Sequence, residues 1–510
     1  MGSQTSPGVY PVEIDMGRYV SGISMSRFGV VGTASKGPTD TPTLITDEGQ
    51  LVSTFGYPST DHLGLFAAQR YLREGRQLVY VRVAAYGASA AEGTSTKVGG
   101  GTTVFTAAGS LTPNTGSWGN DLSVVIGTGT DASTHRVSVK YQGTTVESFD
   151  LIVVGSANAA STNFIDTRIN GVSEFISVED TGVGDALTAG TVTLTGGDDG
   201  VPVDNSDIIG AYNTPPTIPS TGLHCFDNKE SIQIDFVATP GYTDAAVVQA
   251  LITLAETRTD CVALIDPPYG LTVMQVVAWH NGTSALPEAP TAGLDSSYAA
   301  LYWPWVQVYD SRSEAYVWIP PSGYAAQVFA RTDAVAEVWW APAGNNRGQL
   351  LDVIDVEHNA TQGERDYMMG NGNMVNPLCK LHENAPYCIW GQQNLQRATT
   401  SRNRLTVRRM LIYLRRAIAD ASEAILMDPN DEITWSNFRT LVDPTFRKLV
   451  DARALSDYSV ICDSSTNTVE LQRNNTMLAK LLVVPVGTVE ILRLQFINLP
   501  TGASISEIVV

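Results

Sequence analysis

Three segments near the start of the chain decide the fold. They read FGVVG at residues 28–32, DHLGLFAAQRYLR at residues 61–73 and QLVYVRV at residues 77–83. The first and third have the length and apolar character of buried strands, and the second places Leu65, Ala68 and Leu72 on one side of a helix. This strand–helix–strand order favours a parallel or mixed sheet covered by helices. We therefore predict an α/β core that starts at Phe28.

The same pattern returns later in the chain, after an interruption. Helices are expected over residues 243–258, 271–280 and 323–334, and strands over residues 261–266 and 298–309. The interruption, residues 87–200, is rich in Thr, Gly, Ser, Ala and Val, and its short strand-like runs alternate with turn clusters. We predict a mixed α/β fold, in which residues 28–86 plus 201–343 form an α/β sandwich core and residues 87–200 form an inserted, β-rich outer domain.

A final α+β domain is predicted over residues 344–499. It holds two long helical patterns, at residues 402–426 and 432–454, followed by strand-like runs at residues 458–462, 481–484 and 489–497. Pro444 is expected to kink or break the second helix, because proline has no N–H to donate and its ring clashes with the preceding turn.

The two ends of the chain are strand-like but have no obvious partner nearby. The N-terminal arm, residues 1–27, and the C-terminal arm, residues 500–510, alternate apolar and polar positions or carry an apolar run. Their apolar residues are Val9, Val12, Ile14, Met16 and Ile23 in the first arm and Ile505, Ile508 and Val509 in the second. Such segments need a sheet edge elsewhere, in this chain or another.

Composition narrows the classes of partner. In 510 residues, 52 acids face 32 bases, so the formal net charge is −20. A chain this acidic is not expected to have nucleic acid as its main partner, because phosphate binding needs a basic surface. No apolar run is long enough for a transmembrane helix, so direct membrane insertion is not expected. The five cysteines are scattered and do not suggest a disulfide framework.

The search for catalytic or metal chemistry is mostly negative. The chain has no phosphate-binding GxxxxGK[ST] loop, no GxSxG, no HExxH and no CxxC. A GxGxxA match at residues 127–132 lies between two strand-like runs, which predicts a hairpin turn and not a dinucleotide site. Two sets of possible metal ligands lack the spacing of a common zinc or calcium site: His358, Cys379, His382 and Cys388 for zinc, and Asp198, Asp199, Asp204 and Asp207 for calcium. We predict no catalytic residues, no metal and no cofactor, and keep a hydrolase on an α/β core as the alternative.

One tract departs from the acidic average. Residues 384–419 contain no Asp or Glu but seven arginines. In a helix, Arg402, Arg404, Arg408, Arg409, Arg415 and Arg416 share one side with Leu405 and Ile412, opposite an apolar arc. Three interpretations stay open for this side: a solvated arginine face paired with acids from elsewhere in the chain, a docking face for an acidic partner, or a nucleic-acid groove.

Several motifs together resemble the contractile tail sheath proteins. The similar segments include Pro7-Gly8-Val9-Tyr10, FGVVG at residues 28–32, the glycine-rich loop at residues 194–200 and the stretch PPSGYAA at residues 320–326, which continues to WAPAG at residues 340–344. The resemblance covers nearly the whole chain except the insertion. Two places depart from the family pattern, Ala326-Gln327 and the segment at residues 391–395, so local contacts there are not carried over.

The resemblance implies a structural subunit and not an enzyme. It implies a helical homopolymer around a tail tube, in which the two arms add strands to a neighbouring subunit's C-terminal domain and contraction is a rearrangement of subunit packing. The implied partners are further copies of the chain, a tail tube protein, and baseplate and tail terminator proteins, within a virion tail assembled in the host bacterial cytoplasm. The arginine side of residues 402–416 becomes a candidate tube-facing surface. The resemblance does not distinguish a phage tail from a tailocin or a secretion-system sheath.

Overall fold

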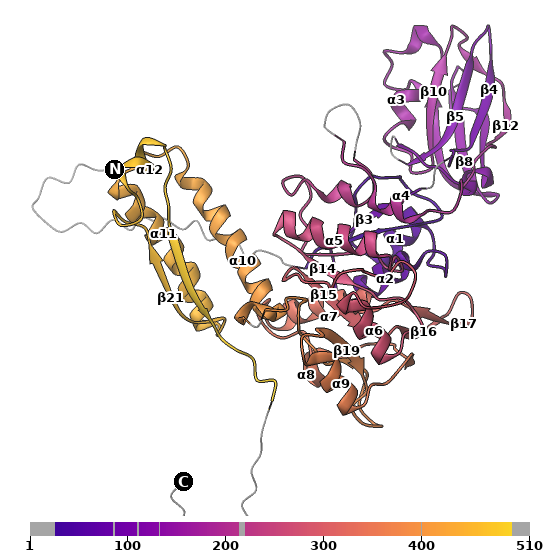
Figure 1. The fold of residues 1–510 in the computed structure, drawn as a ribbon. Coiled ribbons are helices and arrows are strands. Elements are labelled where there is room, and N and C mark those ends of the chain that lie inside the picture. Colours follow the sequence, from indigo (N-terminus) through magenta and orange to yellow (C-terminus); the bar gives the residue numbers. More distant parts are fainter. Residues whose placement is uncertain are drawn as a thin grey trace, which may run out of the picture. The chain divides into compact units, whose positions relative to one another are not determined.

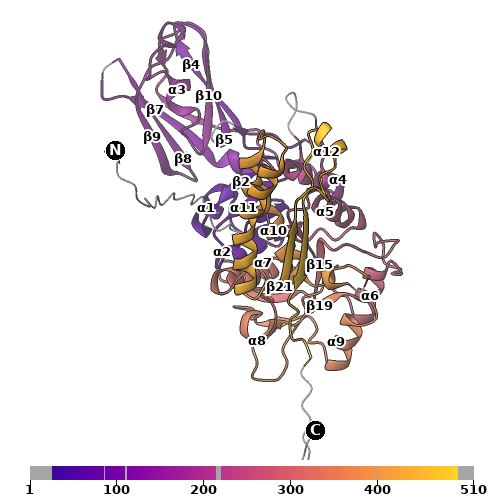
Figure 2. The same ribbon diagram turned by 90° about the vertical axis from the view of Figure 1, so that its left-hand side faces the viewer.

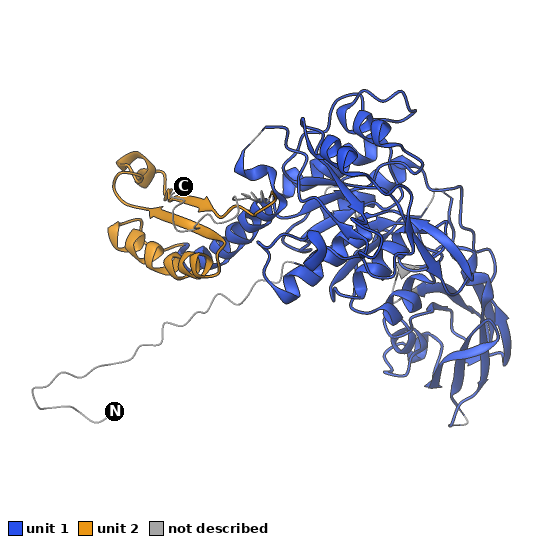
Figure 3. Ribbon diagram, turned by 90° about the horizontal axis from the view of Figure 1, so that it is seen from below, with its two compact units in different colours: residues 1–426 blue, residues 427–510 orange. Residues whose placement is uncertain are grey.

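A computed structural model describes residues 26–84, 87–109, 112–131, 133–213, 220–398 and 400–491. Its contacts divide the chain into two compact units, Met1–Leu426 and Met427–Val510, which are coloured separately in Figure 3. The eight apolar arm residues predicted to pair with a neighbour lie outside the described residues.

A mixed, mostly parallel sheet forms the centre of the first unit (Figure 1). In the described part of the chain its order is β2-β3-β1-β13-β14-β15-β19-β20, and only the two outermost strands run antiparallel to their neighbours. The strands are β1 (Phe28–Gly32), β2 (Thr43–Ile45), β3 (Leu78–Arg82), β13 (Phe236–Ala238), β14 (Val262–Ile265), β15 (Ala299–Trp303), β19 (Val375–Cys379) and β20 (Cys388–Ile389). The inner strands are continuous apolar runs because both of their faces are covered.

Helices pack on both faces of this sheet, as the views in Figures 1 and 2 show. The helices of the core are α1 (Glu48–Phe55), α2 (Leu63–Leu72), α4 (Asn205–Ile209), η3 (Gly222–Phe226), α5 (Ala245–Arg258), α6 (Val273–Asn281), α7 (Ser322–Val335), α8 (Gly344–Arg347) and α9 (Gln362–Met369). Helices α5 and α6 share one apolar cluster with Val31, Val237 and Leu301 of the strands. On the opposite face, the ring of Phe236 meets Phe329 of α7 at 4.9 Å. The fold is therefore mixed α/β, as predicted.

Several smaller elements complete the first unit. A three-stranded sheet is formed by β16 (Val306–Asp310), β17 (Ala315–Ile319) and β18 (Asp355–Val356). Further along, η4 (Ser401–Asn403), α10 (Leu405–Ser422) and η5 (Glu423–Ile425) end the unit. We predicted that the core stops at residue 343, but β19 pairs in parallel with β15 in the central sheet. Because that strand and α10 both belong to the first unit, we propose a boundary near residue 426 in place of 343.

The insertion folds as two facing antiparallel sheets. Its elements are β4 (Glu92–Val98), β5 (Thr102–Gly109), β6 (Thr112–Pro113), η1 (Ser117–Asp121), β7 (Leu122–Thr128), β8 (His135–Tyr141), β9 (Thr144–Ile152), η2 (Ser156–Asn158), α3 (Ile165–Ile169), β10 (Ile176–Thr181), β11 (Ala186–Leu187) and β12 (Gly190–Thr193). One sheet runs β10-β5-β4-β11, with β6 on β5, and the other runs β12-β7-β8-β9. They enclose an apolar core of their own that includes Phe105, Val124 and Val139. Strands β7 and β8, which flank the GxGxxA segment, pair in antiparallel fashion up to Thr128 and His135, which confirms the predicted hairpin.

The second unit is small. It consists of α11 (Glu432–Asp451), β21 (Leu455–Ile461), α12 (Val469–Arg473) and β22 (Lys480–Pro485). Pro444 does not break α11, which continues for seven residues beyond it. The helix packs on one face of the sheet, where Phe446 stacks on Tyr458 with ring centroids 4.9 Å apart. The predicted strand at residues 489–497 is not formed at residues 489–491, and its remainder lies outside the described residues.

Candidate assembly surfaces

Helix α10 carries the arginine tract, and its arginines reach the edge of the central sheet where the parallel strands begin. Arg416 donates to Asp235, which precedes β13, at 2.7 Å, and to the carbonyl of Asp260, which precedes β14. Arg415 donates to the carbonyl of Thr259, at the end of α5. The C-terminal end of a helix carries partial negative charge on its free carbonyls, so this edge of the sheet attracts cations.

The middle of the tract is buried inside the first unit. Arg409 pairs with Asp333 of α7 at 2.5 Å, and the two side chains are 1% and 9% exposed. Its guanidinium lies over the rings of Phe236 and Phe329, at 5.0 and 4.9 Å from their centroids. Arg408 donates to Ser297 and lies 4.2 Å from the ring centroid of Tyr298. These residues therefore hold the helix against the core.

This burial corrects the predicted tube-facing surface. Leu405, Arg408, Arg409 and Ile412 are all buried, so they do not form an outward face of the subunit. Arg404 and Arg416 are half-buried, and Arg402 and Arg415 are exposed. The interpretation of a solvated arginine face paired with acids from elsewhere in the chain holds only in part. Arg409 and Arg416 do pair with such acids, but these pairs are internal and not solvated, because the acids lie on the core.

Burial shifts the pKa values of Asp333 and Asp235, the two acids that pair with arginines of α10. Burial raises the pKa of Asp333 to about 6, against the opposing effect of Arg409. Burial also raises the pKa of Asp235, while Arg416 lowers it. A carboxylate taken out of water needs a partner to stay ionised, and the arginines of α10 supply it. The signal in the sequence was an acid directly before a buried strand, as at Asp235.

The sheet of the second unit presents open edges and an open face. Among the described residues it has two strands, β21 and β22, so the outer edge of each is not paired with a further strand. Tyr458 and Val483 are opposite each other and lie on the face that α11 covers. Leu482 and Val484 alternate with them and are 55% and 52% exposed. Sequence reasoning identified these strands but not that the apolar residues of β22 point to both faces.

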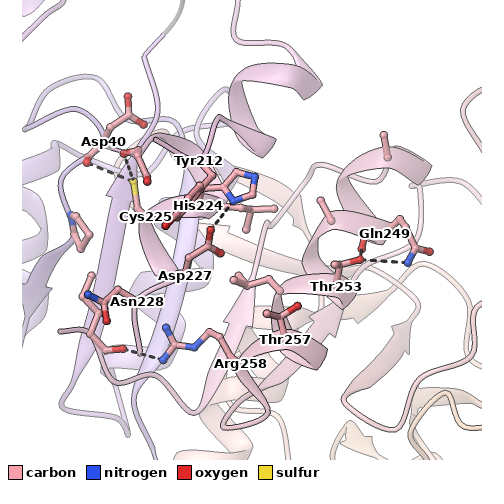
Figure 4. A pocket seen from close by; sticks show the side chains of 17 residues that line it. Asp40, Tyr212, His224, Cys225, Asp227, Asn228, Gln249, Thr253, Thr257 and Arg258 are labelled. Carbon is pink, nitrogen blue, oxygen red and sulfur yellow. Dashed lines mark hydrogen bonds and ion pairs between the residues drawn. The ribbon is translucent and has the colours of Figure 1, made fainter. Parts of the chain in front are cut away.

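A large cavity in the first unit is not arranged for catalysis (Figure 4). It has a volume of about 1040 Å³ and is lined mainly by η3 and α5. Its histidine and thiol face different partners: His224 Nδ1 is 2.7 Å from Asp227, and the Sγ of Cys225 donates to the carbonyls of Asp40 and Ser220. Burial raises the pKa of Cys225 to about 12, which keeps the thiol protonated and poorly nucleophilic at neutral pH.

The weak metal candidates have other structural roles. Asp204 caps α4 in a reciprocal pair with Asp207, and Asp199 accepts from the backbone and hydroxyl of Ser117. His358 pairs with Glu364. Cys379 and Cys388 are opposite each other on the paired strands β19 and β20. Within the described ranges, no three His, Cys, Asp or Glu side chains are grouped as a metal site. No helix in those ranges has both the length and the apolar character needed to cross a membrane.

Comparison with known proteins gives the family. A family model described as the phage tail sheath protein central domain matches residues 221–394, and one described as the phage tail sheath C-terminal domain matches residues 398–497. The tail sheath protein of Vibrio phage KVP40 is 27% identical over 278 residues, which cover 52% of this chain and 41% of that protein. The chain belongs to the contractile tail sheath family, whose members named here are structural sheath proteins.

Solved structures share the fold. A sheath tail protein from Listeria innocua matches with a TM-score of 0.60 and 14% identity, covering 90% of this chain and 95% of that one. The sheath complex of the extracellular contractile injection system PVC, in its contracted state, matches with a TM-score of 0.56 and 16% identity. That match covers 98% of this chain and 99% of the other. By contrast, the chain spans 41% to 65% of the length of the curated phage relatives it matches.

Proposed function

We propose that this chain is the structural subunit of a contractile tail sheath, which polymerises helically around an inner tube. The observation that carries the proposal is the incomplete sheet of the second unit. A two-stranded sheet is marginal by itself in water, and three or more strands or a covering layer are needed for stability. Among the described residues, one face is covered by α11, and the outer edges and the other face are available for further strands and contacts.

The added strands would come from the arms of neighbouring copies. Residues such as Val9, Val12 and Ile14 of the N-terminal arm and Ile505 and Ile508 of the C-terminal arm supply apolar side chains for this. Backbone hydrogen bonds along an open edge give affinity, and the alternation of side chains fixes the register. The arm and the sheet edge that receives it are different surfaces, so each pairing leaves one arm and one edge free to bind further copies. Repeated pairing of this kind builds a helical assembly.

Contraction would then be a change in packing between subunits that stay linked through their arms. The remaining partners in the proposal are a tail tube protein inside the polymer and baseplate and tail terminator proteins at its ends. The setting is a virion tail assembled in the host bacterial cytoplasm. For tube contact, the exposed Arg402 and Arg415 remain candidates, whereas the buried arginines between them do not.

Truncation and surface variants test the proposal. Removing residues 1–25 or 501–510 is expected to leave soluble subunits that form no tubes in electron micrographs, because the open sheet edges lack their strands. A point variant, Leu482→Asp, places a charge on the open face of β22 and is expected to reduce tube formation at least tenfold, measured by sedimentation. Normal tubes from either truncation would reject the arm exchange.

A matched control separates assembly from folding. Val469 of α12 is 63% exposed in the same unit, so Val469→Asp makes a similar change at a similarly exposed site off the sheet. We expect this variant to assemble as the parent does and both variants to keep the parent's circular dichroism. Equal loss of tubes in the two variants would show that the open face of the sheet has no special role.

A further inference from the structure

A lysine and an aspartate meet inside the insertion, shielded from water. Lys97 Nζ lies 2.9 Å from Asp180 Oδ1, and both side chains are 0% exposed. Lys97 is on β4 and Asp180 on β10, with β5 between them in the sheet. Removing two charges from water costs several kcal/mol for each ion, so a fully buried pair of this kind calls for a specific explanation.

Glycines make room for the lysine side chain to cross β5. A Cβ on Gly101 would lie 3.1 Å from Lys97 Cε and only 2.3 Å from the carbonyl oxygen of Thr181. A Cβ on Gly184 would lie 2.9 Å from Lys97 Cβ. Gly101 also has φ +103, a conformation that a residue with a side chain rarely adopts. The backbone around Lys97 is thus built to bring its amine to Asp180.

The carboxyl group of Asp180 is held on both oxygens. The hydroxyl of Thr103 donates to Oδ1 at 2.6 Å, and the backbone N–H of Gly155 donates to Oδ2 at 2.8 Å. Lys97 Nζ also donates to the carbonyl of Gly182 at 3.3 Å. The amine therefore approaches one oxygen of a fixed carboxyl group, while a backbone donor is placed on the other.

A second carboxyl group lies beside the pair. Asp166 of α3 accepts from the backbone N–H of Asp180 at 3.1 Å through its Oδ1. Burial and the nearby charge of Asp180 raise the pKa of Asp166 to about 6, and Lys97 opposes this shift. Asp166 can therefore hold or release a proton near neutral pH, one hydrogen bond away from the backbone of Asp180.

The fixed geometry and the exclusion of water affect the reactivity of Lys97 with Asp180. The amine and the carboxyl group are fixed in contact, and neither side chain is exposed to water. An amine and a carboxyl group held in this way can condense to an amide, because fixed geometry replaces a bimolecular encounter. We propose that Lys97 and Asp180 condense in the folded insertion to form an intramolecular isopeptide bond.

The atoms balance without any added reagent. One proton passes from the Lys97 ammonium to Oδ1 of Asp180, and the freed Nζ lone pair attacks Cγ. The new N–C bond places negative charge on Oδ2, where the Gly155 N–H stabilises it. Asp166 takes the excess proton from the nitrogen and delivers it to the departing Oδ1. The Cγ–Oδ1 bond breaks, one water leaves, and a secondary amide remains. No oxidation or reduction occurs.

The bond would tie β4 to β10 across β5 by a covalent link. Hydrogen bonds already join these strands in one sheet, but the link persists when the hydrogen bonds break. A cross-link between residues distant in sequence restricts the unfolded chain. The insertion would therefore resist heat and pulling more strongly than its small apolar core explains. This inference concerns the insertion alone and stands apart from the proposed assembly.

Intact-mass spectrometry of the full chain tests the proposal. We expect the purified protein to be lighter than its sequence by the mass of one water, and a proteolytic digest to contain one branched peptide joining residues 97 and 180. A protein at its full sequence mass, after allowance for loss of Met1, overturns the proposal.

Two variants exclude other sources of the mass change. Dehydration to a succinimide at Asp199-Gly200 would also remove one water, but Lys97→Arg would not prevent it. The mass loss is expected to disappear in Lys97→Arg, and its persistence there would overturn the proposal. Asp166→Asn keeps the reacting pair and removes the proton carrier, so bond formation followed by mass after refolding is expected to slow roughly 100-fold or more. Rescue by Asp166→Glu would separate proton transfer from packing.

Discussion

Substitution of Arg409 by methionine is the sharpest test of how the arginine tract is used. At an effective dielectric constant of about 20, unit charges 2.5 Å apart attract by roughly 6–7 kcal/mol. Burial of the two ions costs several kcal/mol each, so the intact pair adds little net stability. Loss of Arg409 alone leaves the carboxylate of Asp333 buried without its partner. We therefore expect Arg409→Met to lower the free energy of unfolding by about 3–5 kcal/mol.

The assay is urea denaturation at pH 8, followed by far-ultraviolet circular dichroism. Above the raised pKa of Asp333 its carboxyl group is ionised, so the penalty is present at this pH. The double variant Arg409→Met with Asp333→Leu removes both charges, and we expect it to recover most of the loss. Asp333 Oδ1 and two nitrogens of Arg409 lack a hydrogen-bond partner among the described residues, so few other hydrogen bonds are lost with the pair.

The same substitution at Arg415 supplies the control. Arg415 is exposed on the same helix and donates one bond of 3.3 Å, so Arg415→Met is expected to change stability by less than about 0.5 kcal/mol. If Arg409→Met lowered the free energy of unfolding as little as Arg415→Met, Arg409 would behave as a surface residue, and its role inside the first unit would be rejected. A double variant as unstable as the single one would show that the lost ion pair is not the cause.

Three further predictions concern the core. Gly323→Ala is expected to destabilise by about 1–3 kcal/mol in spite of alanine's better helix propensity, because its Cβ would lie 2.5 Å from the Cα of Ala67 on α2. The matched change Gly363→Ala, where the Cβ meets nothing within 4 Å, is expected to stabilise slightly; equal effects in thermal melts would contradict the packing argument. Burial raises the pKa of Asp266 to about 7 from 3.8, so the folded form retains a proton that the unfolded form loses between these values. Wild-type stability should therefore fall by a few kcal/mol relative to Asp266→Asn as pH rises from about 4 to 7 and stay level above, and parallel pH profiles would contradict this. Finally, Cys225 is expected to resist alkylation at pH 8 in the folded chain, judged by peptide mapping; rapid labelling would show that its thiol is not buried as described.

The α/β core was predictable because its signals are local and redundant. The apolar runs at β1, β3 and β14 have the period and length of buried strands, and the intervening helices show one apolar side. The continuation of the sheet through β19 was missed. That strand reads NPL in its middle, with a polar residue and a proline, and only pairing with β15 identifies it as part of the core.

The arginine tract shows the limit of reasoning from one helix. Its periodicity correctly predicts a helix over most of the tract, although Arg402 and Arg404 precede α10. Periodicity describes a face and not what covers it. The covering acids, Asp235 and Asp333, lie far away in sequence, and only the fold brings them to α10. The same holds for Lys97 and Asp180, which no spacing rule connects.

By itself, then, the sequence determined the class of fold, the presence of an insertion and the resemblance to tail sheath proteins. Each of these depends on patterns within short segments, where neighbouring side chains impose the local conformation. Tertiary structure decided which charged residues face inward, where the core sheet ends and which sheet keeps its edges open. These depend on long-range pairing, because burial is a property of the surroundings of a residue and not of the residue itself.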